Sequence, residues 1–245
     1  MLLLLPPSET KRDGGLDSTA LDLGALSFAA LTSQRVPVVA GLRRLSRSVG
    51  GSMTALSLGP TQRFEIDRNR AVATSPVMPA VERYTGVLYD ALDVASLSEP
   101  ARAFAGEHLV IHSALLGLVR GSDPIPAYRL SHDSRLPGLS LRRHWREAVT
   151  AVLAAEDGLV LDLRSDSYIA LGPTPSSAVP IRVVSEDARG RRVALSHFNK
   201  AGKGRFARAV VEAGVVHPDL DSLLEWAATR QIRLDPTETG LDLVV

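Results

Sequence analysis

Residues 159–168 of the chain read LVLDLRSDSY, a short apolar run followed at once by polar side chains. Runs of this length, bounded by turn-forming residues, are typical of buried strands. The polar segment SEDARG, between two later runs, predicts a hairpin. The other runs that predict strands are Leu2–Leu5, LVIHSA at 109–114, IRVV at 181–184, RRVALSHF at 191–198 and LDLVV at 241–245.

Apolar residues recur at helical spacing between these runs. The alternation of strands and helices predicts an α/β fold, with a mixed β-sheet flanked by helices and residues 1–245 forming a single domain. In Gly14–Thr74, glycines and serines alternate with helical fragments, which predicts a helical lobe near the N-terminal third. The other helices are expected over Ala80–Leu92, Leu141–Ala155, Gly204–Ala213 and Asp219–Thr229.

Composition excludes several classes of protein. Of 245 residues, 45% are hydrophobic and 22% charged, which is enough apolar material for a sizeable core. The absence of cysteine excludes disulfides, cysteine-ligated zinc or iron–sulfur sites and a cysteine nucleophile. The N-terminal MLLLLPP lacks a basic region, so we expect a strand there rather than a signal peptide. No apolar stretch approaches the roughly 18 residues of a membrane span, and we expect a cytoplasmic protein with no membrane partner.

Positive charge is unevenly distributed although the net charge is only +1. No acidic residue occurs between Leu23 and Phe64, or between Arg189 and Arg208. Two such blocks predict one positive face that binds phosphates; scattered, solvated arginines are the alternative. The bases concerned include Arg43, Arg44 and Arg47 in the first block and Lys200, Lys203, Arg205 and Arg208 in the second.

Polar residues also follow the predicted strands, and open α/β sheets bind ligands outside the carboxyl ends of their strands. The most explicit case is Asn199–Arg205, predicted as a glycine-containing basic turn that leads into a helix near Gly204. Helix N-termini bind phosphate through free backbone N–H groups, although this turn lacks the Walker A pattern. A solvated basic turn is the alternative, and His197 beside it is a further candidate phosphate contact.

Catalytic residues are less well defined. Asp166 and Asp123 are the acid–base candidates, with Ser165 beside the first and Glu9 as a possible partner. His108 and His112 lie four residues apart, but they bracket a predicted strand and have no clear third ligand. We therefore expect no metal and no cofactor.

Several motifs together resemble the YaaA family of peroxide stress proteins, over Met1 to about Val211. The most specific is HSALLGLVRGSDPIPAYRL at 112–130; LLLLPPSETKR, ERYTGVLYDALD, LVLDLRSDSY and SHFNKAGKGRFAR occur in the same order. The resemblance implies a family-specific α/β fold with a positively charged cleft. It also implies binding to double-stranded or branched DNA and a role in limiting free iron and oxidative damage. The phosphate-binding positions that it implies are Ser8, Lys11, Arg83, Tyr84, Arg120, Tyr128, Arg129, Lys200, Arg205 and Arg208.

The sequence departs from the family pattern at three places. Arg164 stands where a small residue is usual, and the basic run at 200–205 has an extra residue. The family's helix-hairpin-helix element would fall near Pro37–Phe64, with Val49-Gly50-Gly51 as its hairpin. Arg43, Arg44 and Arg47 keep the basic character that a DNA contact needs.

Two hypotheses therefore remain open. The first is a DNA-binding stress protein, for which aromatic residues at only 4% argue against single-strand stacking. The second is an enzyme acting on a nucleotide or nucleobase in the same polar cleft, with Lys11 and Arg205 holding the phosphate. Direct iron binding is disfavoured, since no ligand set can be named.

Overall fold

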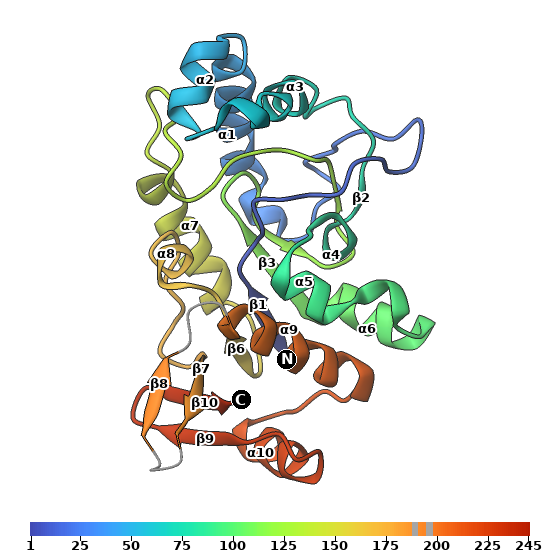
Figure 1. The fold of residues 1–245 in the computed structure, drawn as a ribbon, viewed down its shortest axis with the longest axis vertical. Helices are drawn as coiled ribbons and strands as arrows, with labels where there is room; N and C mark the ends of the chain where they lie inside the picture. The colour runs from blue at the N-terminus through green and yellow to red at the C-terminus, as the bar shows by residue number, and fades with distance from the viewer. Residues whose placement is uncertain (188–190, 195–197) are drawn as a thin grey trace.

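A computed structural model of the chain describes residues 1–187, 191–194 and 198–245, and shows a mixed α/β fold as predicted (Figure 1). In this part of the chain one sheet has the order β4-β3-β1-β6-β7-β10-β9, with β8 paired to β7. A small second sheet pairs β2 (Met78–Pro79) with β5 (Pro124–Ile125). The strands of the main sheet are β1 (Leu2–Leu5), β3 (Leu109–Ser113), β4 (Gly117–Arg120), β6 (Val160–Asp162), β7 (Val179–Glu186), β8 (Arg192–Ala194), β9 (Leu234–Thr237) and β10 (Gly240–Val244).

The centre of the sheet is parallel. β1 is bonded in parallel to β3 on one side and to β6 on the other, with Leu4 opposite both Val110 and Asp162. All four β1 residues are buried leucines, as expected for a strand covered on both faces. The predicted hairpin of β7 and β8 is confirmed for the described residues. β4 and β9, which are antiparallel to their neighbours, were not predicted.

This strand order creates a topological switch point. β3 and β6 both follow β1 in sequence, yet they lie on opposite sides of it. The chain therefore leaves β1 in one direction and later crosses back over it. Loops that leave the carboxyl ends of β1 and β6 consequently diverge and leave a crevice between them, which is the usual ligand position in such sheets.

Helices cover both faces of the sheet and form a lobe at one end. α7 and α8 lie on one side of the sheet and α5, α6 and α9 on the other (Figure 1). The predicted helical lobe is confirmed as α1, α2 and α3, at the top of Figure 1. α7 and α10 match their predicted bounds within one residue. The helices are α1 (Thr32–Leu45), α2 (Val49–Ala55), α3 (Phe64–Arg70), α4 (Ala80–Arg83), α5 (Val87–Leu92), α6 (Glu99–His108), α7 (Leu141–Ala154), α8 (Asp166–Ile169), α9 (Phe198–Ala213) and α10 (Leu220–Thr229), with 3-10 turns at Ala29–Leu31, Pro60–Gln62 and Val94–Ser96.

Two helix predictions were wrong. The expected helix Ala80–Leu92 is broken between α4 and α5, where Gly86 has a φ of 97° and Tyr84 pairs with Lys11 in a β-bridge. The expected basic turn Asn199–Arg205 lies within α9, which begins at Phe198. Its glycines allow close packing instead of phosphate approach.

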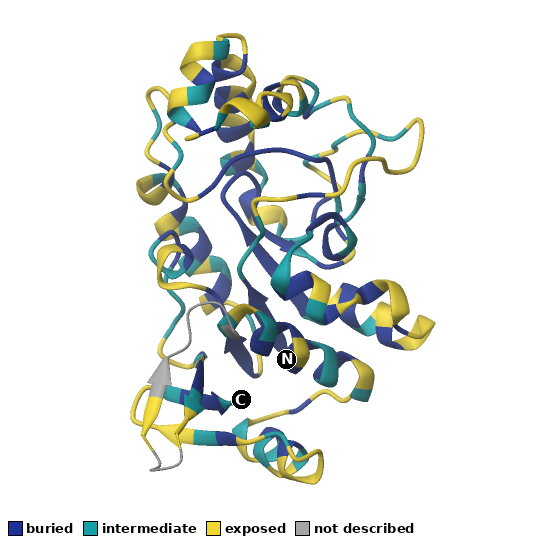
Figure 2. Ribbon diagram, viewed as in Figure 1, coloured by how far each residue is buried: buried dark blue, intermediate teal, exposed yellow. Residues whose placement is uncertain are grey.

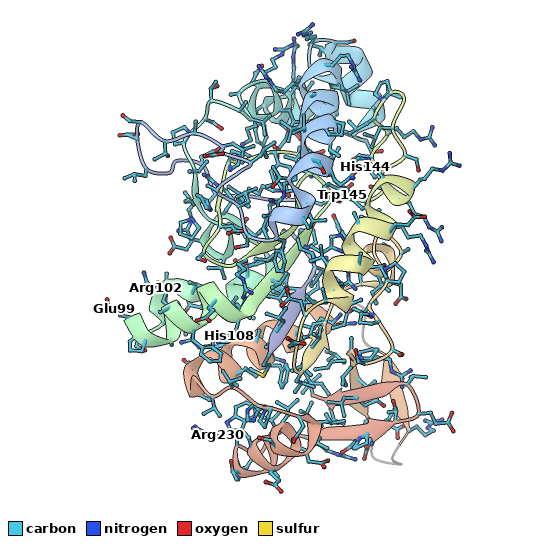
Figure 3. All side chains as sticks on the ribbon, turned by 180° about the vertical axis from the view of Figure 1, so that it is seen from behind. Glu99, Arg102, His108, His144, Trp145 and Arg230 are labelled. Atoms are coloured by element: carbon cyan, nitrogen blue, oxygen red, sulfur yellow. The ribbon has the colours of Figure 1, made fainter. Side chains whose placement is uncertain are left out.

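A single core unites these layers, and buried residues concentrate on the central strands and the inward faces of the helices (Figure 2). Trp145 of α7 is fully buried, and its indole N–H donates to the carbonyl of Ala114 at 2.9 Å. His144, beside it, contacts the carbonyl of Gln34 in α1 (Figure 3). α7 thus joins the sheet to the helical lobe.

Substitution of Gly204 tests the close packing of α9 on α5. A Cβ atom at this position would lie 2.2 Å from the carbonyl oxygen of Leu88. We expect Gly204→Ala to lower the free energy of unfolding by about 1–3 kcal/mol, because α9 must move away from α5. Gly50→Ala is the matched control, since a Cβ atom there meets nothing within 4 Å. Its stability should stay the same or rise by up to about 1 kcal/mol. Equal stability of the two variants in urea unfolding would refute the packing role.

Candidate functional site

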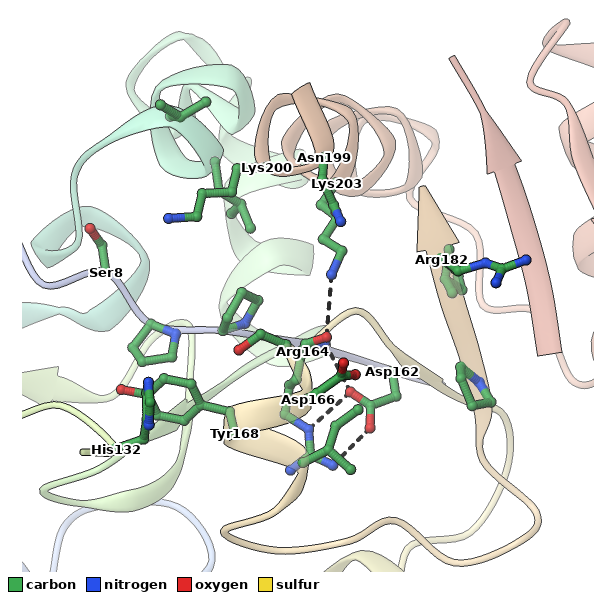
Figure 4. A pocket seen from close by; sticks show the side chains of 18 of the residues that line it. Ser8, His132, Asp162, Arg164, Asp166, Tyr168, Arg182, Asn199, Lys200 and Lys203 are labelled. Carbon is green, nitrogen blue, oxygen red and sulfur yellow. Dashed lines mark hydrogen bonds and ion pairs between the residues drawn. The ribbon is translucent and has the colours of Figure 1, made fainter. Parts of the chain in front are cut away.

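A cleft of about 830 Å³ lies at the switch point (Figure 4). The segment after β1, Pro6–Thr10, forms one wall, and the segment after β6, from Asp162 to Ile169, forms the floor. The first turns of α9 face the floor with Asn199, Lys200 and Lys203. The rest of the lining comes from Thr85–Tyr89, from Ser131 and His132, from the start of β7 and from the C-terminal hairpin, Thr237–Asp242. Segments far apart in sequence thus meet around one cavity.

A buried ion pair supports the floor. The Arg164 guanidinium donates to both carboxylate oxygens of Asp162, from Nε at 2.9 Å and from Nη2 at 2.7 Å, and neither side chain is exposed. Its Nη1 also reaches the carbonyl of Gly172 at 2.9 Å and Nδ1 of His112 at 2.8 Å. Bidentate contact and the further acceptors offset the cost of removing both charges from water.

This contact fixes the protonation of His112. A guanidinium only donates hydrogen bonds, so Nδ1 of His112 must accept and the ring proton lies on Nε2. Burial, and secondarily the nearby Arg164 charge, lower the pKa of His112 well below its usual 6.5. The imidazole is therefore neutral at physiological pH.

Lys203 is the buried cation of the cleft. Its side chain is only 7% exposed, and Nζ donates to the carbonyl of Arg164 at 3.2 Å. Desolvation lowers the pKa of Lys203, while the negative charges of Asp162 and Asp166 oppose the shift. Figure 4 shows the ammonium pointing down from α9 toward Arg164 and Asp166.

The remaining surface is partly aromatic and apolar. The rings of Tyr168 and His132 meet edge to face, with centroids 5.4 Å apart. Tyr89 is anchored through its hydroxyl, which donates to the carbonyl of Pro6 at 2.9 Å. Burial raises the pKa of the Tyr168 phenol far above its usual value, so this ring is a neutral surface. An apolar wall with a few polar groups is typical of small-molecule sites.

The structure brings several sequence candidates together here. Ser8, Glu9, Ser165, Asp166, Lys200 and Lys203 all line the cleft. His132 and Arg182 also line it and were missed, because no motif or partner in the sequence marks them; Asn199 lines it as part of the predicted segment Asn199–Arg205. Glu9 and Asp166 share the cavity, as their suggested pairing requires.

Other candidates are buried outside the cleft. Lys11 is 5% exposed, and its Nζ donates to the carbonyl of Ser8 at 3.0 Å, 4.1 Å from the centroid of the Tyr128 ring. Desolvation lowers the pKa of Lys11 to about 7. The hydroxyls of Tyr84 and Tyr128 are 2.7 Å apart, and Tyr128 lies 2.6 Å from Ser113 Oγ. Lys11, Tyr84 and Tyr128 are therefore buried and bonded internally, outside the cleft, and their binding of a phosphate stays a prediction.

Arg83 and Asp123 also have internal partners. Arg83 is fully buried and donates to the backbone carbonyls of Ile125, Arg12, Gly14 and Pro76. Asp123 accepts from the backbone N–H and the hydroxyl of Ser27 and from the N–H of Arg120. Arg83 holds loops together, and Asp123 does not reach the cleft as an acid–base group.

Three further arginines also have partners within the protein. Arg129 is 6% exposed and forms an ion pair with Glu9. Arg208 forms an ion pair with Glu212 at 2.8 Å and reaches Asp93 at 3.5 Å. The Arg120 side chain donates to the carbonyl of Glu107. Internal contacts thus occupy these predicted phosphate ligands.

The exposed bases do not form one face. Arg43, Arg44 and Arg47 are exposed at the end of α1 and in the turn before α2, whereas α9 lies in the lower half of the molecule (Figure 1). Arg205 is exposed on α9 outside the cleft. Within the helical lobe, Val49-Gly50-Gly51 begins α2 and does not form the expected hairpin, because Ser48 caps that helix. His197 lies outside the described residues.

No metal cluster was found in the described ranges, where no three His, Asp or Glu side chains come together suitably. No helix described by the structure is long and apolar enough to cross a bilayer.

Comparison with known proteins places these residues in a family context. The family model for the peroxide stress protein YaaA matches residues 1–229. A UPF0246 protein of Corynebacterium glutamicum strain R is 44% identical over 215 residues, which cover 86% of this chain and 84% of that protein. A UPF0246 protein of Streptomyces coelicolor is 42% identical over 233 residues, covering 92% and 88%. A UPF0246 protein of Polynucleobacter asymbioticus is 28% identical over 241 residues, covering 89% and 88%.

The lowered pKa of His112 predicts that the protein loses stability as the pH falls. Because the folded state lowers this pKa, the unfolded chain binds the extra proton first as pH falls below about 6.5. Below that pH, we expect wild type to lose up to about 1.4 kcal/mol of unfolding free energy per pH unit more than His112→Asn, whose amide oxygen can accept from Arg164. Urea unfolding between pH 7.5 and 5 measures the difference. Parallel curves for the two proteins would show that His112 does not titrate as described.

Proposed function

The chain belongs to the peroxide stress protein YaaA family, and on this premise we propose that it binds double-stranded or branched DNA during peroxide stress and so limits free iron and oxidative DNA damage. A stress-related role follows from the family. DNA binding and the effect on iron are the finer parts of the proposal. It places the protein in the cytoplasm, where bacterial DNA lies.

The exposed arginines of the helical lobe are the observation that carries the proposal. Arg43, Arg44 and Arg47 are exposed within a stretch of chain that contains no acidic residue. In the described part of the chain no ion pair to a carboxylate is recorded for any of them, whereas Arg68 and Arg70 of α3 are both paired. Exposed guanidinium groups without a described carboxylate partner are suited to phosphate contacts, which dominate affinity for DNA.

Phosphate contacts in this proposal shift from the cleft to the lobe. Lys11, Arg83 and Lys203 donate to backbone carbonyls, so little of their charge faces a duplex. Lys200 and Arg205 remain exposed on α9. We expect them to contribute to a second, weaker phosphate contact.

The cleft favours a second function, an enzyme or receptor for a nucleotide or nucleobase. Its volume of about 830 Å³ is suited to a small molecule. Asp166, Ser165 and Lys203 stand in it as polar groups, and Asp166 is the acid–base candidate within reach of a bound ligand. DNA binding through the lobe requires no such cavity.

Salt-dependent titration tests the DNA proposal. A plot of log affinity against log salt concentration has a negative slope, and each lost phosphate contact should reduce its magnitude by about 1. We therefore expect the triple variant Arg43→Gln/Arg44→Gln/Arg47→Gln to reduce the magnitude of this slope by about 3 for duplex and four-way-junction DNA. The measurement is fluorescence anisotropy at several salt concentrations.

The control removes the same charge elsewhere. Arg102 lies on α6 and Arg230 follows α10, both away from the helical lobe (Figure 3), and Arg191 precedes β8. Arg102→Gln/Arg191→Gln/Arg230→Gln should leave the slope near the wild-type value. An equal loss in both variants would mean that only net charge matters, and an unchanged lobe variant would overturn the proposed surface.

A further inference from the structure

We propose that the cleft reads the amide edge of a keto nucleobase, that of guanine, thymine or uracil, between the Lys203 ammonium and the Asp166 carboxylate. The inference rests on the second candidate function and names its ligand class. In such a base a carbonyl oxygen stands beside a ring N–H. A donor and an acceptor on opposite sides of the cleft can hold both groups at once.

Lys203 supplies the donor. Its Nζ has three N–H bonds, and the hydrogen bond recorded for it within the described residues goes to the Arg164 carbonyl at 3.2 Å. The side chain is more than nine-tenths buried and lines the cavity. Its position is fixed, because the accepting carbonyl belongs to a residue whose own guanidinium is locked to Asp162 and His112. Its remaining N–H groups can therefore bind a carbonyl oxygen of a ligand.

Asp166 supplies the acceptor. It lies in the first turn of α8, is exposed to the cleft and faces Lys203 across it (Figure 4). Within the described residues, Asp166 and Lys203 do not form an ion pair with each other. Both oxygens of the Asp162 carboxylate, by contrast, already accept hydrogen bonds from Arg164. Glu9 and Asp242 also line the cleft, but they are paired with arginines, so Asp166 is the lining carboxylate left to accept from a base N–H.

Asn199 adds a further unpaired group. It lines the cleft in the first turn of α9, and its Oδ1 is buried with no hydrogen-bond partner in the described part of the chain. Buried polar atoms are rarely left unpaired. An amide at this place can accept from an exocyclic amine or donate to a carbonyl on the same base.

The shape of the cleft suits a planar ring. Tyr168, edge to face with His132, and the Pro6 segment present apolar faces to the cavity. Lys200 lies one helical turn before Lys203 and points instead toward the rim beside Ser8 (Figure 4). A base at Lys203 would thus place its sugar and phosphate toward Lys200 and solvent.

Binding of four 5′-monophosphates tests this assignment. Isothermal titration calorimetry of the full chain should show that GMP and UMP bind at least about tenfold tighter than AMP and CMP. Asp166→Asn should lower GMP affinity about tenfold and reduce that preference. Asp166 is exposed, so this variant should fold, which its thermal unfolding transition would confirm. Lys203→Met should act in the same direction if it folds.

Two controls locate the effect. Arg230→Ala, just after α10 and outside the cleft, should leave both affinity and preference unchanged. Lys200→Met should weaken binding of GMP but not of guanosine, because only the phosphate reaches the rim. Absence of nucleotide binding to wild type, or equal affinity for the four bases, would overturn the inference. Lobe-dependent DNA binding would survive that result, so the two proposals fail separately.

Discussion

The buried Arg164–Asp162 ion pair is the interaction on which the cleft depends. One residue joins four parts of the fold: its guanidinium binds Asp162 of β6, His112 of β3 and the carbonyl of Gly172, and its carbonyl accepts from Lys203 of α9. Removing one partner of such a pair leaves an uncompensated buried charge, which costs about 3–5 kcal/mol. The floor is therefore held rigidly, as a site that orients a ligand requires.

Several positively charged side chains of this protein donate hydrogen bonds to backbone carbonyls. Arg35 donates to the carbonyls of Leu116, Leu118 and Ser27, and Arg83 binds four more. Burial lowers the pKa of both residues to about 10, so both remain charged at neutral pH. These arginines tie loops to one another and to the strands β4 and β5, which contain Leu118 and Ile125. Counting bases along the chain therefore overestimates the charge available to DNA.

The molecule separates two kinds of recognition. The helical lobe exposes arginines that have no ion pair within the described residues, which suits a repeating phosphate backbone. The cleft at the switch point combines buried polar groups with aromatic walls, which suit one small planar ligand. In a stress protein that contacts DNA, the lobe would supply affinity, and the cleft would supply selectivity for a single nucleotide or nucleobase.

The sequence alone determined the family, the α/β class, the central strands and the helical lobe, because continuous apolar runs and helical periodicity are local signals. It also placed Ser8, Ser165 and Asp166 after β1 and β6, whose carboxyl ends meet, and identified Lys203 as a candidate. Only the tertiary structure decided which charges stay available: Lys11 and Arg83 became internal donors, and Asn199–Arg205 became part of α9, with Gly204 packed against Leu88. His132 and Asn199 entered the cleft through contacts between segments far apart in sequence. Burial and pairing depend on such long-range contacts, which no local pattern encodes.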